Sequence, residues 1–290
     1  MATISRRQFL SASAAFAAPA VWAAATPHPG CQANAWNLDP ARFDLLLTAL
    51  REMKSLGFAG FETNIRFLQP QMEHVSAARA ALAEIGLEFA GAHTGFPPYE
   101  KLGPERAAEA AGRLAEDAKQ FDARSLVVSH SGLSTAGAAF ERDVESKVKA
   151  LNLAGARVAA TGLLMAYHNH QPEFRNGAAE AAALVKRTDP GSVAFMLDIG
   201  HAWLVYPEVI GFFEEHHQRV YGLHVRDFHD RRSVPLGEGE FPLRKLADAI
   251  RRTGWHGWLI DEEERPDAPD KPGMKATGPS RRTMRAIFGV

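Results

Sequence analysis

Eight short apolar segments alternate with helical stretches along the chain, and this alternation restricts the possible folds more than any other feature. The apolar segments occupy residues 32–36, 60–63, 88–93, 125–130, 163–169, 193–198, 220–225 and 258–261. Between them, apolar side chains recur three and four residues apart, as at Phe43, Leu46, Leu50 and Met53, which is the spacing of a buried helix face. Eight strands that alternate with helices predict a closed α/β structure, the (β/α)8 TIM barrel.

An open, doubly wound sheet is the alternative arrangement for the same alternation. Its nucleotide-binding form carries a glycine-rich turn after the first strand, whereas residues 36–40 of this chain are WNLDP. The closed barrel is therefore favoured. Residues 26–290 are close in length to the about 250 residues of a typical barrel, so we expect one domain over this range. The proline-rich stretch 266–279 predicts a loop before a last helix at 281–288.

The first 25 residues, 1–25, predict an export signal. Two adjacent arginines, Arg6 and Arg7, precede an apolar, alanine-rich stretch at 9–24 that ends in small residues, which is the layout of a secretory signal. The segment resembles a twin-arginine signal peptide through SRRQFL at 5–10. That resemblance implies export in the folded state, a periplasmic location and no stable membrane association after cleavage. An uncleaved leader or membrane anchor is the alternative.

Charge and cysteine content exclude several classes of protein. The chain has 33 Lys and Arg against 34 Asp and Glu, a formal net charge of -1, so it lacks the basic excess that binds a phosphate backbone. We therefore expect no nucleic-acid partner. Cys31 is the single cysteine, which rules out an intrachain disulfide and a zinc site built from cysteines.

Acidic and imidazole side chains gather at the carboxyl ends of the predicted strands, where barrels of this type place their active sites. From the second strand to the eighth, the polar residues there are Glu62, His93, His130, His168, His170, Glu173, Asp198, His201, His224, Arg226, Glu262 and Glu264. So many carboxylates and imidazoles on one rim need a positive charge among them. A mixed set of histidines and carboxylates suits Mn²⁺, Zn²⁺, Co²⁺ or Fe²⁺ better than Ca²⁺. We therefore predict a divalent metal site with open positions for a substrate.

Several of these residues also have a purely structural interpretation. Asp198 can cap the helix that follows the sixth strand. His224 can be a hydrogen-bonded core residue, and 262–264 can be a solvated acidic run. His93 and His130 can contact a neighbouring loop as easily as a substrate. The sequence leaves these alternatives open.

Five motifs accompany the predicted strands in order: YHNHQPEF at 167–174, LDIGHAW at 197–203, LHVRD at 223–227, GEGEF at 237–241 and WLIDEEE at 258–264. Together they resemble the xylose isomerase-like TIM barrel family, the sugar phosphate isomerase and epimerase group. The resemblance implies that Asp198, His224 and Glu262 bind the metal. The glutamate that the family has after its fifth strand is absent here, and we expect His168 to replace it. Glu173 from the following loop, or additional water ligands, are the alternatives.

The resemblance and the chemistry of the site together predict a metal-dependent sugar isomerase or epimerase. A divalent metal that polarises a ketone acidifies the neighbouring C–H group and stabilises the enediolate that forms when the proton leaves. Glu262 is the expected base, and His170 and Glu173 are candidates for returning the proton. We expect substrate contacts from the remaining polar residues of the rim, which are Glu62, His93, His130, His201, Arg226 and Glu264.

The expected cofactor is a divalent metal, with Mn²⁺ favoured and Zn²⁺, Co²⁺ or Mg²⁺ as alternatives. The expected partner is a small carbohydrate, and a homo-oligomer is compatible with the sequence. Two other functions fit the same scaffold: a lyase or hydrolase that acts on a keto-glycoside through the enediolate, and a barrel that binds carbohydrate without catalysis. The spacing of the residues does not choose among isomerisation, epimerisation and elimination.

Overall fold

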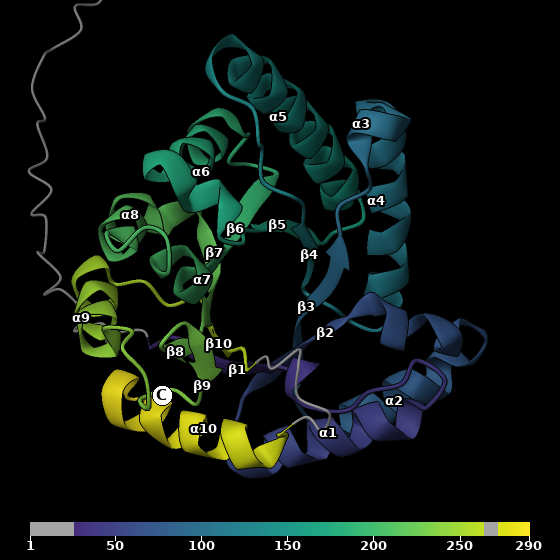
Figure 1. The fold of residues 1–290 in the computed structure, drawn as a ribbon. Coiled ribbons are helices and arrows are strands. Elements are labelled where there is room, and N and C mark those ends of the chain that lie inside the picture. Colours follow the sequence, from purple (N-terminus) through teal and green to yellow (C-terminus); the bar gives the residue numbers. More distant parts are fainter. Residues whose placement is uncertain (1–25, 264–271) are drawn as a thin grey trace, which may run out of the picture.

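Eight parallel strands close into a barrel in a computed structural model that describes residues 26–263 and 272–290. The order of the strands around the barrel is β1-β10-β7-β6-β5-β4-β3-β2, and helices surround them (Figure 1). The predicted (β/α)8 barrel is thereby confirmed. The predicted export signal at 1–25 and the predicted site residue Glu264 lie outside the described residues.

The elements follow one another in the expected alternation. The barrel strands are β1 (His28–Gln32), β2 (Gly60–Asn64), β3 (Glu88–Gly95), β4 (Ser125–Ser129), β5 (Leu164–His168), β6 (Val193–Asp198), β7 (Val220–Val225) and β10 (Trp258–Asp261). The α-helices are α1 (Phe43–Leu56), α2 (Val75–Ile85), α3 (Tyr99–Leu102), α4 (Pro104–Gln120), α5 (Gly137–Ala160), α6 (Arg175–Arg187), α7 (Ile199–Trp203), α8 (Val209–His216), α9 (Leu243–Thr253) and α10 (Met274–Phe288). A small antiparallel hairpin, β8 (Asp227–His229) and β9 (Arg232–Val234), follows β7.

The first strand lies four residues before its predicted position at 32–36. It is β1, and the residues after it form a short 3-10 helix, η1 (Ala33–Ala35). Pro29 and Gly30 are residues that usually interrupt a strand. Here the Pro29 carbonyl still accepts a hydrogen bond from Ala59 N at 2.8 Å. A Cβ atom at Gly30 would meet Ile260 Cδ1 at 2.4 Å, so the crowded barrel interior requires glycine at this position.

The last helix begins seven residues before its predicted start at 281. α10 contains Pro279 in its second turn, where proline removes the backbone hydrogen bond to the carbonyl four residues earlier. Arg281 on this helix donates hydrogen bonds to the Gly57 carbonyl from Nε at 3.2 Å and Nη2 at 2.9 Å. Contacts with the end of α1 therefore hold a helix that the local sequence does not indicate.

An apolar layer fills the barrel beneath its mouth. Its buried residues are Ala90, Val127, Ala166, Met196, Trp258 and Ile260. Glycines face the two largest of them: a Cβ atom at Gly222 would meet Met196 Sδ at 2.6 Å, and one at Gly60 would meet Trp258 Cη2 at 2.5 Å. Because side chains alternate along a strand, the inward position two residues later lies one layer nearer the mouth. On β5, β6 and β10, the positions two residues after Ala166, Met196 and Ile260 carry three of the polar residues described next, which are His168, Asp198 and Glu262.

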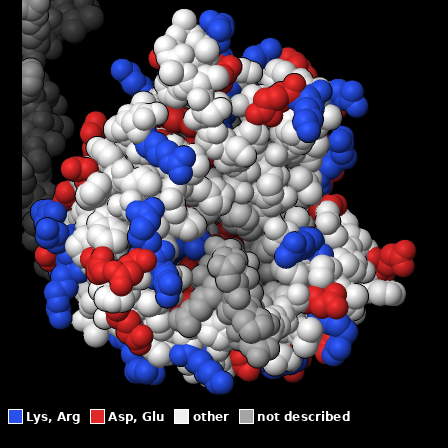
Figure 2. Space-filling view, viewed as in Figure 1, with Lys and Arg blue, Asp and Glu red and all other residues white. Residues whose placement is uncertain are grey.

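Charged residues of both signs are interspersed around the periphery of the molecule (Figure 2). This distribution agrees with the formal net charge of -1. Within 26–263 and 272–290, every helix is too short or too polar to span a bilayer.

Candidate metal centre

Four side chains form a compact buried cluster one layer above the apolar filling. His168 ends β5, Asp198 ends β6, His224 lies on β7 and Glu262 follows β10. These four strands are adjacent in the barrel, and strand alternation turns all four side chains inward. Their candidate ligand atoms lie within 4.8 Å of one another. Ligands that are each about 2.0–2.2 Å from one ion lie up to about 4.4 Å apart, so a slight contraction brings all four onto one metal.

His168 presents a neutral imidazole to the cluster. Burial, together with the rings of His224 and His93, holds the pKa of His168 well below its usual value. Its Nδ1 atom is buried and has no hydrogen-bond partner within the described chain. A neutral imidazole with an unused nitrogen is the form of histidine that binds a metal.

His224 lies between two carboxylates. Its Nε2 is 2.5 Å from Glu62 Oε2, and its Nδ1 is 2.5 Å from Glu262 Oε2. Burial alone would lower the pKa of His224, but Glu262 and Glu62 raise it well above the usual value. The two carboxylates therefore favour either a positively charged ring or a metal ion bound to one of its nitrogens.

Asp198 contacts two neighbours with its two oxygens. Oδ1 accepts a hydrogen bond from His201 N at 2.8 Å and caps α7, as the structural interpretation of the sequence expected. Oδ2 lies 2.8 Å from Arg226 Nε and 3.0 Å from His201 Nδ1. Burial raises the pKa of Asp198, but Arg226 and His201 lower it well below the usual value. The carboxylate is therefore ionised, as a metal ligand must be.

Arg226 supplies part of the positive charge that the cluster needs. Besides contacting Asp198, its Nη2 lies 2.6 Å from Glu262 Oε2, and Asn34 Nδ2 donates to Glu262 Oε1 at 3.3 Å. Burial raises the pKa of Glu262, but Arg226 and His224 bring it well below the usual value. The sequence suggested a substrate contact for Arg226, and the structure places its guanidinium across two carboxylates of the cluster.

The cluster fits a divalent metal in its donor atoms and in its charge. Two imidazoles and two carboxylates are a donor set that divalent transition metals accept. The buried carboxylates of Glu62, Asp198 and Glu262 lie around the cluster, and the guanidinium of Arg226 contacts two of them, Asp198 and Glu262, so the acidic side chains outnumber this cation. A divalent ion would balance this acidic excess, whereas leaving it uncompensated would be costly.

Three further histidines surround the cluster toward the barrel mouth. The ring of His168 has its centroid 5.0 Å from that of His93 and 4.9 Å from that of His170. The rings of His170 and His201 are 6.0 Å apart. Burial holds the pKa of His93 below its usual value. The structure thus brings these three predicted site residues together beside the candidate metal ligands.

Two other predicted contacts are not part of this group. His130 directly follows β4, where its Nε2 is 3.2 Å from Glu100 Oε1 and its ring packs against Tyr99 with centroids 5.1 Å apart. Glu264 falls outside the described residues.

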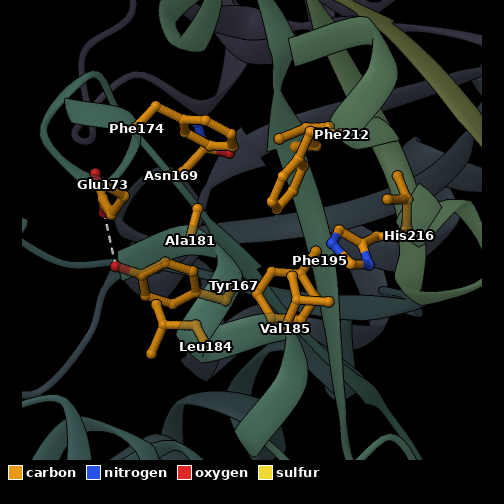
Figure 3. A pocket seen from close by; sticks show the side chains of 12 residues that line it. Tyr167, Asn169, Glu173, Phe174, Ala181, Leu184, Val185, Phe195, Phe212 and His216 are labelled. Carbon is orange, nitrogen blue, oxygen red and sulfur yellow. Dashed lines mark hydrogen bonds between the residues drawn. The ribbon is translucent and has the colours of Figure 1, made fainter. Parts of the chain in front are cut away.

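Glu173 faces away from the cluster. Its Oε1 accepts a hydrogen bond from the Tyr167 hydroxyl at 2.7 Å, and its Oε2 accepts one from His170 N at 3.1 Å. Figure 3 shows this carboxylate beside Tyr167 at an apolar pocket that Phe174 and Phe212 also line. Both carboxylate oxygens are engaged. This placement favours a structural role, in which Glu173 fixes the loop after β5, over the predicted catalytic role and the alternative role as a ligand.

Two residues that support the cluster were missed in the sequence. Asn34 from η1 contacts Glu262. Asn169 accepts a hydrogen bond from Asp198 N and donates one to Asp198 O, both at 3.0 Å. Asn169 is part of the YHNH motif, which gave a signal for its position. No signal in the sequence indicated Asn34, because the first strand was predicted at 32–36 and included this residue.

Asp227 organises the loop at 237–241 beside the mouth. Its carboxylate accepts backbone hydrogen bonds from Gly237 at 2.9 Å, Gly239 at 3.0 Å and Phe241 at 2.9 Å. A Cβ atom at Gly239 would meet Asp227 Oδ1 at 2.3 Å. Gly239, the second glycine of the GEGEF motif, is therefore needed for the loop to close on this carboxylate.

Glu62 is expected to strengthen metal binding through His224 rather than through the metal itself. We predict that Glu62→Gln weakens the affinity for Mn²⁺ by about tenfold to a hundredfold, because carboxylates that orient ligating histidines typically contribute that much. Titration calorimetry with Mn²⁺ measures the change, and the exposed Glu73→Gln is the matched control. An affinity equal to that of the wild type would show that Glu62 does not act on His224.

A closed parallel barrel with a buried histidine and carboxylate cluster near its mouth places the protein among TIM barrels with a candidate metal centre. Residues 50–287 match the family described as xylose isomerase-like TIM barrel. The chain therefore belongs to this family, as its motifs suggested.

Two relatives found by sequence are inosose dehydratases. The chain is 25% identical over 138 residues to that of Lacticaseibacillus casei, an alignment that covers 41% of this chain and 46% of the relative. It is 24% identical over 255 residues to that of Geobacillus thermodenitrificans, with 77% and 83% covered. The match thus spans about half the length of the first relative, as its coverage of 46% shows, and most of the second.

Three solved structures share the fold over nearly the whole chain. A sugar phosphate isomerase/epimerase from Parabacteroides distasonis has a TM-score of 0.72 at 18% identity, covering 93% of this chain and 96% of that one. A 3-keto-D-glucoside 4-epimerase from E. coli has 0.70 at 18%, covering 91% and 100%. A D-psicose 3-epimerase from Clostridium cellulolyticum has 0.69 at 16%, covering 90% and 99%. At these identities the likeness shows the fold.

Proposed function

We propose that the protein is a metal-dependent enzyme that removes the proton next to the ketone of a keto-sugar and returns it as an epimerase or isomerase. The observation that carries this proposal is the buried cluster of His168, Asp198, His224 and Glu262 at the barrel mouth. Membership of the family and the named activities of the two epimerases that share the fold support it.

The four residues of the cluster would hold the metal, and we favour Mn²⁺ because it accepts imidazole and carboxylate ligands together. When bound, the ion supplies Lewis-acid polarisation of a substrate carbonyl, which acidifies the adjoining C–H group. The remaining steps are proton transfers by the residues of this chain.

Glu262 is the proposed base. Burial raises the pKa of Glu262, but the opposite effect of Arg226 and His224 is larger and brings the pKa well below its usual value. The carboxylate is therefore ionised. The hydrogen bond from Asn34 to Oε1 fixes its orientation. Because a carboxylate with so low a pKa is a weak base, it removes a proton only from a C–H group that has been acidified. A bound metal would supply this acidification.

His170 is the proposed acid on the other side of the substrate. Its ring lies between those of His168 and His201, with centroids 4.9 and 6.0 Å away. Return of the proton from this side would invert the carbon, which is epimerisation. His93 and His201 then contact substrate hydroxyls. His93 suits this task because burial, by lowering its pKa, keeps the ring neutral and able to donate or accept a hydrogen bond.

Dehydration is the second candidate reaction, and the inosose dehydratase relatives favour it. It begins with the same proton removal by Glu262. The carbon next to the carbanion centre then loses its hydroxyl, which departs as water after taking a proton from an acid such as His170. The two candidates therefore share the first step and differ in whether a C–H or a C=C bond forms in the second.

We also propose that the chain is exported through the twin-arginine route and acts in the periplasm on a small carbohydrate. SRRQFL at 5–10 supports the route. An exported enzyme meets few sugar phosphates, so an unphosphorylated substrate fits this location.

Deuterium exchange tests the proposed function. Mn²⁺-loaded protein is incubated with a panel of keto-sugars in D2O, and NMR follows the hydrogen next to the ketone. We expect exchange that chelator-treated protein does not catalyse. Inversion at the exchanged carbon would identify an epimerase, and loss of water would identify a dehydratase. Metal-loaded protein that exchanges no compound of the panel would contradict both.

A further inference from the structure

We propose that a hollow beside the cluster binds a second sugar ring, so that the substrate class is a keto-disaccharide rather than a single keto-sugar. This inference rests on the proposed function and specifies its substrate. The residues that line the hollow include Phe96, Ser129, His130, Ser131, His170 and Pro172. They come from the ends of β3, β4 and β5 and from the loops that follow them.

His170 joins the hollow to the cluster, because it lines the hollow and its ring also lies 4.9 Å from that of His168. Phe96 directly follows the end of β3 and comes three residues after His93. At about 3.3 Å per residue, Phe96 lies about 10 Å farther toward the mouth. With bonds of about 1.5 Å, a pyranose ring and its hydroxyls span about 5 to 6 Å. A keto-sugar ring that reacts at the cluster is therefore too short to fill the hollow as well. A second sugar ring, linked to the first, would occupy it.

The lining has the mixture of surfaces that a sugar ring presents. The half-buried Pro172 offers apolar surface, against which the C–H face of a pyranose can pack, and Phe96, of which 5% is exposed, adds a smaller apolar area. Ser129 and Ser131 provide hydroxyl groups beside them, suited to the hydroxyls at the edge of the ring. His130, whose two ring nitrogens contact Glu100 and the Ser131 carbonyl, forms part of the wall. A few polar groups on an apolar lining are typical of small-molecule sites.

The walls of the hollow are held in place before any ligand binds. His130 Nδ1 lies 3.0 Å from the Ser131 carbonyl, and Lys147 Nζ donates to the same carbonyl at 3.1 Å. A Cβ atom at Gly132 would meet Pro172 Cβ at 2.3 Å, so the loops after β4 and β5 are in direct contact. A site whose walls are already fixed loses little free energy in ordering them when a ligand binds.

Titration calorimetry on the Mn²⁺-loaded protein tests this inference with 3-keto-trehalose and methyl 3-keto-α-glucoside. The two compounds carry the same ketone, but only the first has a second sugar ring. We expect the wild type to bind 3-keto-trehalose at least about tenfold more tightly. Ser131→Trp fills the hollow with an indole and should bring the two affinities within about threefold. Ser134→Trp, an exposed position on the same loop, should keep the preference. His130→Ala serves as a second variant if thermal unfolding shows that the Ser131 variant is destabilised.

Equal affinities in the wild type, or a preference that Ser131→Trp and His130→Ala both leave intact, would overturn the inference. Deuterium exchange in the same samples separates this failure from that of the proposed function. If both compounds exchange deuterium and bind with equal affinity, the proposed function is supported and the second-ring site is rejected. If 3-keto-trehalose binds more tightly but neither compound exchanges deuterium, the second-ring site is supported and the proposed function is rejected.

Discussion

Glu262→Gln should slow deuterium exchange of the keto-sugar by at least about a thousandfold. The change removes the proposed base and one of the four proposed metal ligands, while the shape of the side chain is kept. It also takes a charged partner from Arg226 Nη2, 2.6 Å away, and from His224 Nδ1, 2.5 Å away. Exchange rates are compared at saturating Mn²⁺, so that weaker metal binding does not account for the whole loss.

Glu238→Gln is the matched control, because it removes one exposed carboxylate from the neighbouring loop at 237–241. We expect its exchange rate to stay within about twofold of the wild type, as for a surface substitution away from the site. A Glu262→Gln variant that retained more than about a tenth of the wild-type rate would show that another group removes the proton.

Lys147→Met should destabilise the fold by about 3–5 kcal/mol, the largest stability effect expected of a single change here. Lys147 and Glu180 are a buried ion pair with side-chain exposures of 0% and 4%, and Lys147 Nζ lies 2.6 Å from Glu180 Oε1. Without the lysine, the buried Glu180 carboxylate loses the cation that it pairs with. Its Oε2 accepts a hydrogen bond from Leu133 N at 2.7 Å, so the β4 loop should loosen as well. Denaturant unfolding measures the loss.

Two further variants separate the buried charge from other causes. Lys147→Met combined with Glu180→Gln should recover most of the loss, since no uncompensated charge remains and the amide oxygen can still accept from Leu133 N. Lys149→Met breaks an ion pair with Glu105 whose side chains are 60% and 65% exposed, and should cost no more than about 1 kcal/mol. A single Lys147→Met variant as stable as this control would contradict the interpretation.

Most of the barrel and the positions of the candidate ligands could be predicted from the sequence. The strands at 193–198, 220–225 and 258–261 occur at their predicted residues, because each is a mostly apolar run with a polar residue at its end or directly after it. Strand alternation then determines which side chains face inward. For this reason Asp198 and His224, each at an inward position, lie in the same cluster.

The first strand could not be placed from local signals. Pro29 and Gly30 usually interrupt strands, and the need for glycine at 30 comes from Ile260, more than two hundred residues away. The misplaced strand in turn hid Asn34, whose amide contacts Glu262. Packing between distant segments decided both positions.

The orientation of loop side chains and the partners of buried ion pairs could not be predicted from the sequence either. Glu173 follows β5 in a loop, where no periodicity tells which way a side chain points, and it lies against Tyr167 behind the strand. Arg226 sits at an inward position and was expected to meet a substrate. Its contacts with Asp198 and Glu262 depend on the distance between three strands, which only the closed barrel determines.

Metal content tests the central claim most directly. The wild type and an Asp198→Ala, Glu262→Ala double variant, purified without chelator, are analysed by mass spectrometry for bound metals. We expect about one divalent ion per wild-type chain and almost none in the variant, since residues 26–263 and 272–290 hold one such four-residue cluster. A wild type that holds no metal even after incubation with Mn²⁺ or Zn²⁺, or a variant that holds as much as the wild type, would contradict it.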